Sequence, residues 1–131
     1  MRDAVIEVFA YWPVSRVAEF ITSADSALRK SYPGIRIVAF GHMGDGNIHY
    51  NVSMPDAGQN KIFIAQQEDA VNKQVYAVVR ELGGSISAEH GLGQLKRATI
   101  RDYKDPLELE LMRDIKQALD PQGLMNPGKV L

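Results

Sequence analysis

All three histidines of this 131-residue chain lie in glycine-rich segments whose residue types suit metal binding or acid–base chemistry. The first segment, GHMGDGNIHYN, covers residues 41–51 and contains His42 and His49. Asp-Gly between two runs of alternating apolar residues is typical of a tight β-hairpin. A two-residue loop at Asp45-Gly46 would place His42 opposite His49, with Cβ atoms about 5 Å apart. Asn51 would then lie on the same face of the hairpin.

Two imidazoles in that arrangement suit a shared metal ion, because each ring nitrogen binds zinc at about 2.0–2.1 Å. An ordinary hairpin with solvated histidines is the alternative, and the pattern alone does not separate the two. The chain has no cysteine, which excludes disulfides and thiolate metal sites. Histidine and carboxylate ligands suit zinc, manganese or iron(II).

The second segment, GGSISAEHGLGQLKR, covers residues 83–97 and contains the Glu89-His90 pair. The pair would end a short strand, and the glycines after it allow the backbone to approach a ligand closely. Glu89 would supply an oxygen ligand, while His90 stays available as a base. A solvated charge pair before a glycine loop is the alternative. Gly91-x-Gly93 is weak evidence for phosphate binding, because no complete G-x-G-x-x-G follows a strand.

Apolar periodicity predicts the elements that must position these residues. Strands are expected at about 4–11, 35–40, 47–53 and 85–88, and helices from Pro13 to about residue 31, at about 61–82 and from Asp105 to about residue 120. The last helix begins with the capping-box sequence Asp105-Pro106-Leu107-Glu108 and carries an apolar face made by Leu107, Leu111, Met112, Ile115 and Leu119. This order predicts an α+β fold, namely a ferredoxin-like antiparallel sheet with helices on one face, followed by a C-terminal helix and tail.

Composition narrows the class of protein. Hydrophobic residues make up 45% of the chain and charged residues 24%, as in a soluble globular domain. The net charge of −1 argues against a nucleic-acid partner. No apolar run is long enough for a transmembrane segment, and the N-terminus does not resemble a signal peptide. We therefore expect a single domain over residues 1–131, in the cytoplasm.

With these segments identified, the sequence resembles the C-terminal domain of FAD-linked oxidases, a family that includes D-lactate dehydrogenase, the glycolate oxidase flavoprotein subunit and D-2-hydroxyglutarate dehydrogenase. The resemblance rests on residues 41–51 and 83–97, on DPQGLMNPGKVL at 120–131 and, more loosely, on PVSR at 13–16. It extends over nearly the whole chain. It implies a substrate and cap domain that works with an FAD-binding domain or subunit, which we expect to lie outside this chain.

The resemblance also implies an activity, the oxidation of a D-2-hydroxy acid of the lactate, glycolate or 2-hydroxyglutarate type to the 2-oxo acid. The isolated chain is then expected to be inactive and to form homo-oligomers. FAD and a divalent metal, zinc before manganese or iron, are the implied cofactors. The implied site residues are the metal ligands His42, His49 and Glu89, the base His90, the substrate-binding Asn51 and the FAD contact Asn126.

One position departs from the family. Some relatives carry a lysine in the first strand, where this chain has Glu7. Two other functions remain open from the sequence. One is a non-catalytic ferredoxin-like binding module that retains the motifs, and the other is a small metal-dependent hydrolase.

Overall fold

The computed structural model describes residues 6–87, 91–94 and 96–131. The chain divides into two compact units, Met1–Glu89 and His90–Leu131. The first unit contains a three-stranded sheet and two long helices, and the second contains two helices and the C-terminal segment. No helix in the described ranges is long and apolar enough to cross a membrane.

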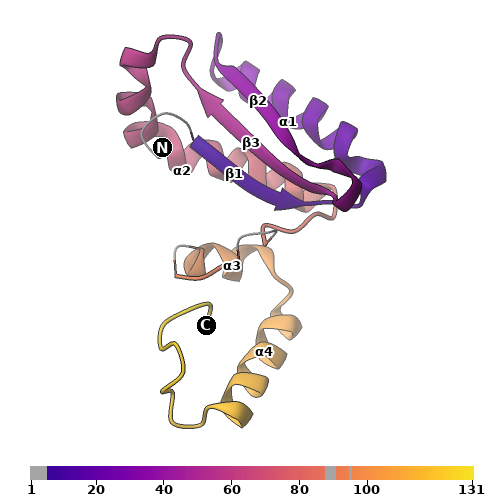
Figure 1. The fold of residues 1–131 in the computed structure, drawn as a ribbon, viewed down its shortest axis with the longest axis vertical. Helices are drawn as coiled ribbons and strands as arrows, with labels where there is room; N and C mark the ends of the chain where they lie inside the picture. Colours follow the sequence, from indigo (N-terminus) through magenta and orange to yellow (C-terminus); the bar gives the residue numbers. More distant parts are fainter. Residues whose placement is uncertain (1–5, 88–90, 95) are drawn as a thin grey trace. The chain divides into compact units, whose positions relative to one another are not determined.

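The first unit is an antiparallel sheet with helices on one face (Figure 1). Its strands are β1 (Ile6–Tyr11), β2 (Arg36–His42) and β3 (Asn47–Ser53), in the order β1-β3-β2. The helices are α1 (Val17–Ser31), which follows a 3-10 turn at Val14–Arg16, and α2 (Ala57–Glu81). The predicted α+β class is confirmed.

The core of this unit lies between the sheet and the two helices. Alternate residues of two strands are buried, namely Ile6, Val8 and Ala10 in β1 and Ile48, Tyr50 and Val52 in β3. Trp12, just after β1, stacks on Phe20 of α1 at a ring-centroid distance of 3.7 Å. Each fully buried valine, isoleucine or phenylalanine side chain contributes about 1.5–3 kcal/mol to folding. The period-2 pattern therefore leaves the opposite sheet face open for polar residues.

The fourth predicted strand, 85–88, forms one isolated antiparallel bridge between Ser85 and Tyr11. Two backbone hydrogen bonds of 2.8 Å join these residues, and Ala88 lies outside the described residues. The bridge lies at the free edge of β1, where the last strand of a ferredoxin-like sheet belongs.

Helix α2 begins four residues before its predicted start near residue 61. The Asp56 side chain caps it by accepting a hydrogen bond from the Gly58 amide at 2.9 Å. Asn60 is buried, and its side-chain oxygen accepts a hydrogen bond from the Met54 amide at 2.6 Å. The polar residues predicted to form a loop therefore cap and anchor the helix.

The second unit contains α3 (Arg97–Tyr103) and α4 (Pro106–Leu119). Asp105 caps α4 as predicted, accepting a hydrogen bond from the Leu107 amide at 2.8 Å. The Glu108 carboxylate accepts instead from Lys104 Nζ at 3.1 Å. Helix α3 was not predicted, because seven residues with one fully buried side chain, Ile100, give too little periodicity.

The C-terminal segment of the second unit is anchored at the end of α4. The buried Asp120 carboxylate accepts hydrogen bonds from the backbone amides of Leu124 and Met125, at 2.8 and 2.9 Å. Lys116 pairs with the same carboxylate. The predicted apolar face of α4 is not a buried one, because four of its residues are more than half exposed, namely Leu107, Leu111, Ile115 and Leu119.

Candidate functional site

The turn between β2 and β3 differs from the predicted two-residue loop. Residues Met43–Asp45 form a 3-10 turn, and Gly46 closes it with a φ of 74°. A type I′ turn would need positive φ at Asp45 as well, and Asp45 does not have it. The predicted pairing of His42 with His49 is therefore wrong: His42 pairs with Asn47, and His49 pairs with Phe40.

The strand register nevertheless places the two histidines on one face. Residues directly opposite in a sheet share a face, so His42, Asn47, His49 and Asn51 all lie on the same side. This is the side opposite the buried residues of β3. His42 and His49 are thus diagonal neighbours, with a typical separation of about 7–8 Å. The described part of the predicted ligand set, His42 and His49, therefore shares one face of the sheet.

An acidic residue of β1 joins this face. Glu7 pairs with Asn51 in the strand register, and its Oε1 atom lies 2.8 Å from His49 Nδ1. The His49 ring also stacks on Phe40, with centroids 4.6 Å apart and planes 8° from parallel. The His49 side chain is 20% exposed. A carboxylate and an aromatic ring therefore hold this imidazole in one orientation.

Sequence reasoning noted Glu7 only as a departure from relatives and did not assign it to the site. The available signal was an acid in an otherwise apolar strand, IEVFAY. Because side chains alternate along a strand, that acid had to lie on the face opposite Ile6 and Val8. Which residue it contacts depends on the pairing of β1 with β3, and neither segment encodes that locally.

Asn51 lies next to Glu7 on the same face. Its side-chain oxygen Oδ1 is buried, and it has no hydrogen-bond partner among the residues that the structure describes. A buried acceptor without a partner costs about 1–3 kcal/mol, which a donor from a bound molecule would offset. The position predicted to contact substrate therefore has an unused acceptor.

The remaining predicted residues are placed as follows. Glu89 and His90 lie outside the described residues. Residues 6–87, 91–94 and 96–131 contain no group of three or more His, Asp or Glu side chains arranged to hold a metal. Asn126 belongs to the C-terminal segment of the second unit, where it adopts a left-handed φ of 47°. Its carbonyl oxygen accepts a hydrogen bond from the Lys129 amide at 3.2 Å.

Comparison with known proteins identifies the family. A family model described as "FAD linked oxidases, C-terminal domain" matches residues 10–130. The chain belongs to this family. The matched range contains both histidine segments and the C-terminal NPGK sequence.

Individual relatives agree with this membership. A D-2-hydroxyglutarate dehydrogenase of Stutzerimonas stutzeri is 38% identical over 99% of the chain and 30% of its own length. The mitochondrial D-2-hydroxyglutarate dehydrogenase of Rattus norvegicus is 37% identical over 91% of the chain and 21% of its own length. A D-lactate dehydrogenase of Anaerostipes hadrus is 33% identical over 90% of the chain and 24% of its own length. The chain thus spans less than a third of the length of these relatives.

Proposed function

We propose that this chain is the substrate-side domain of an FAD-dependent dehydrogenase that oxidises a D-2-hydroxy acid to the 2-oxo acid. Relatives that cover the chain are named D-2-hydroxyglutarate dehydrogenase and D-lactate dehydrogenase, which supports this substrate class. The observation that carries the proposal is the shared sheet face of His42 and His49, with His49 held by Glu7 at 2.8 Å, in a member of a flavoprotein family.

The metal ligands in this proposal are His42, His49 and Glu89. Two neutral imidazoles and one carboxylate match an open catalytic site rather than a closed structural one. A divalent ion held there, with zinc the first candidate, would supply Lewis-acid stabilisation of the substrate oxygens. Glu7 keeps the His49 ring in the orientation in which its Nε2 atom serves as the ligand.

The proton of the substrate hydroxyl goes to His90. A neutral imidazole is a suitable base near pH 7, because its ordinary pKa is about 6.5. Asn51 accepts a hydrogen bond from the substrate through its buried Oδ1 atom. These residues position the substrate and remove its proton, while FAD, when bound, supplies the hydride acceptor.

The open sheet face also supports a partner domain that binds FAD. Two apolar side chains of β2 lie on it, Val38 at 42% exposure and Phe40 at 49%. Together with the polar residues of the site, they form a surface that a flavin-carrying domain would cover. We assign Asn126 as the contact of the second unit with FAD.

The proposal is tested on the complete flavoprotein by measuring metal content and single-turnover flavin reduction in parallel. His42→Ala, His49→Ala and Glu89→Ala should lower both quantities together. His90→Ala should keep the metal and slow flavin reduction by about 10²- to 10⁴-fold, the effect of losing a general base. Asn51→Ala should weaken substrate binding more mildly and leave the metal in place.

Other outcomes would contradict parts of this assignment. If His90→Ala lost the metal while Glu89→Ala retained it, the assigned roles would be reversed, with His90 as the ligand and Glu89 as the base. Full activity of the flavoprotein in all of these variants would contradict a catalytic role for this domain. The domain would then be a non-catalytic binding module. Metal-dependent hydrolysis without flavin would replace the oxidation by a hydrolase function.

A further inference from the structure

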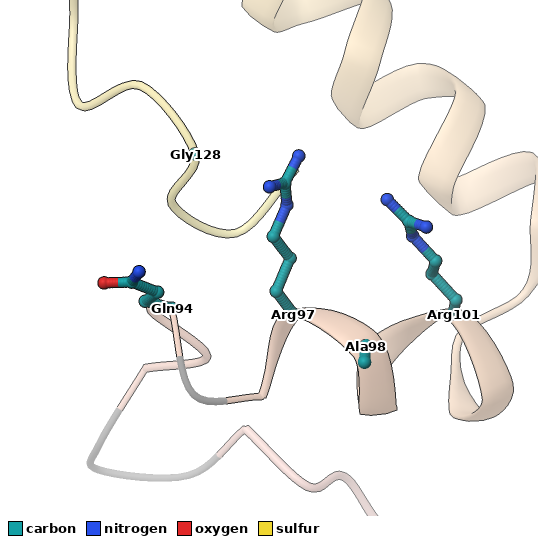
Figure 2. A pocket seen from close by; sticks show the side chains of 5 residues that line it. All are labelled: Gln94, Arg97, Ala98, Arg101 and Gly128. Carbon is teal, nitrogen blue, oxygen red and sulfur yellow. The ribbon is translucent and has the colours of Figure 1, made fainter.

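The second unit contains an open cleft of about 400 Å³, lined by residues other than those assigned above to the proposed oxidation. Figure 2 shows its lining, in which two arginine side chains extend from α3 on the same side of the helix. The lining residues are Gln94, Arg97, Ala98, Arg101 and Gly128. None of them carries a negative charge.

The two arginines are four positions apart on α3, so they are neighbours on its surface. Like charges at this spacing destabilise a helix. Neither guanidinium forms an ion pair within the described parts of the chain. Among the described residues, the two positive charges of the cleft therefore have no paired counter-charge.

The hydrogen-bonding groups of the cleft are mainly donors. The Nε atom of Arg97 is buried and has no hydrogen-bond partner within the described ranges of the chain. A Cβ atom at Gly128 would lie 3.8 Å from Arg97 Nη1, so the guanidinium lies against the C-terminal segment. The side-chain oxygen of Gln94 already accepts from Lys129 Nζ at 2.6 Å, which leaves its NH₂ group as a donor. A ligand of this cleft must therefore supply acceptors and negative charge.

We propose that this cleft binds a diphosphate group. Each planar guanidinium makes paired hydrogen bonds to phosphate oxygens, and linked phosphates supply one such partner for each arginine. A single carboxylate carries one negative charge and would leave one of the two positive charges uncompensated. The volume lies within the usual range for small-molecule sites, about 300–1,000 Å³. Inorganic pyrophosphate and the diphosphate of a nucleotide share this chemistry.

The test is an NMR titration of the arginine Nε–H signals in the 131-residue chain with sodium pyrophosphate, at constant ionic strength. A saturable shift confined to Arg97 and Arg101 is expected. ADP, adenosine and acetate serve as comparison ligands. Equal affinity for pyrophosphate and ADP would support the proposal and show that the cleft recognises only the phosphates. Tighter binding of ADP would also support it and would identify a nucleotide as the ligand.

Three variants give the matched comparison. Arg97→Gln and Arg101→Gln should each weaken pyrophosphate binding roughly tenfold or more, the loss expected for a charge-assisted hydrogen-bond pair. Arg80→Gln removes an exposed arginine of α2 and should change the affinity less than about twofold, because Arg80 does not line the cleft. Circular dichroism establishes that each variant is folded.

Several results would overturn the proposal. Shifts spread evenly over all arginines, shifts that do not saturate, or equal binding of acetate would each show non-specific attraction. Unchanged affinity in folded Arg97→Gln and Arg101→Gln would do the same. If Arg97→Gln fails to fold, the wild-type titration and Arg101→Gln still decide the outcome. None of these measurements involves the histidine site, so this inference and the proposed oxidation fail independently.

Discussion

The Nδ1 atom of His49 in β3 lies 2.8 Å from the Oε1 atom of Glu7 in β1, although 42 residues separate them in the chain. They are diagonal neighbours, because Glu7 pairs with Asn51 and His49 with Phe9. An ionised carboxylate only accepts hydrogen bonds, so its partner Nδ1 carries the proton. The nitrogen assigned to metal binding is then Nε2. The β1–β3 pairing therefore selects the tautomer of a proposed ligand.

We predict that Glu7→Ala lowers the zinc affinity of the complete flavoprotein by about 10- to 100-fold, the usual effect of losing a carboxylate that orients a ligating histidine. Glu7→Gln should lower it less, because an amide oxygen still accepts from Nδ1. Competition with a chromophoric chelator measures both affinities. The control is Glu68→Ala, at an exposed position of α2. Equal zinc affinity in Glu7→Ala and Glu68→Ala would disprove a role for Glu7.

The two glycines that flank Asp45 should respond differently to substitution. Gly46 has a φ of 74°, and a Cβ atom there would lie 1.9 Å from the Trp12 carbonyl oxygen. Gly44 has neither a positive φ nor any atom within 4 Å of an added Cβ. Gly46→Ala should lower the free energy of unfolding by about 3 kcal/mol or more, because the backbone strain and the steric clash add. Gly44→Ala should lower it by less than about 0.5 kcal/mol. Urea unfolding followed by fluorescence of Trp12, the single tryptophan, measures both.

Tyr50 should give the fold a stability that is lost in alkali. Its hydroxyl donates to Asp25 Oδ1 at 2.6 Å, and burial, helped by this bond, strongly raises its pKa. The folded state thus keeps Tyr50 neutral, while the unfolded chain ionises it above about pH 10. The stabilisation of the fold by neutral Tyr50 is therefore complete below about pH 10 and declines as the pH rises further.

Two measurements check this. Ultraviolet titration should show at least one of the five tyrosines resisting ionisation until the chain unfolds. Tyr50→Phe should cost about 1–2 kcal/mol at neutral pH and should make the unfolding free energy fall less steeply in alkali. Ionisation of all five tyrosines in the folded chain would refute the prediction.

Asp120 should hold the C-terminal segment in place. Its carboxylate accepts from Lys116 and from two backbone amides, and these bonds lower its pKa. Asp120→Asn should therefore speed amide hydrogen exchange at Leu124 and Met125. In the wild type the anchor is complete above the ordinary pKa of aspartate, about 3.9, and is lost as the pH falls through the lower folded value. Asp114→Asn, on the exposed part of α4, is the control. Unchanged exchange in Asp120→Asn would argue against the anchor.

Features that depend on neighbouring residues along the chain could be predicted from the sequence alone. The alternation of Asn47–Ser53 predicted β3 with its observed bounds, because each side chain in a strand points to the face opposite its neighbours. Asp105-Pro106 predicted the start of α4, because an acidic cap and a proline satisfy the first turn locally. The histidine segments carried enough family pattern to predict the family that the comparison identified.

The contacts between distant side chains, in contrast, depend on how the whole chain folds. The register of β2 and β3 follows from the backbone of the Met43–Gly46 turn, in which Gly46 packs against the Trp12 carbonyl. In this register His42 pairs with Asn47 rather than with His49, the partner that the sequence had predicted. The contact of Glu7 with His49 required β1 to pair with β3, and the clustering of Arg97, Arg101 and Gly128 required the C-terminal segment to fold back toward α3. These contacts join residues distant in sequence, and the free energy that selects them comes from packing the whole unit rather than from any local pattern.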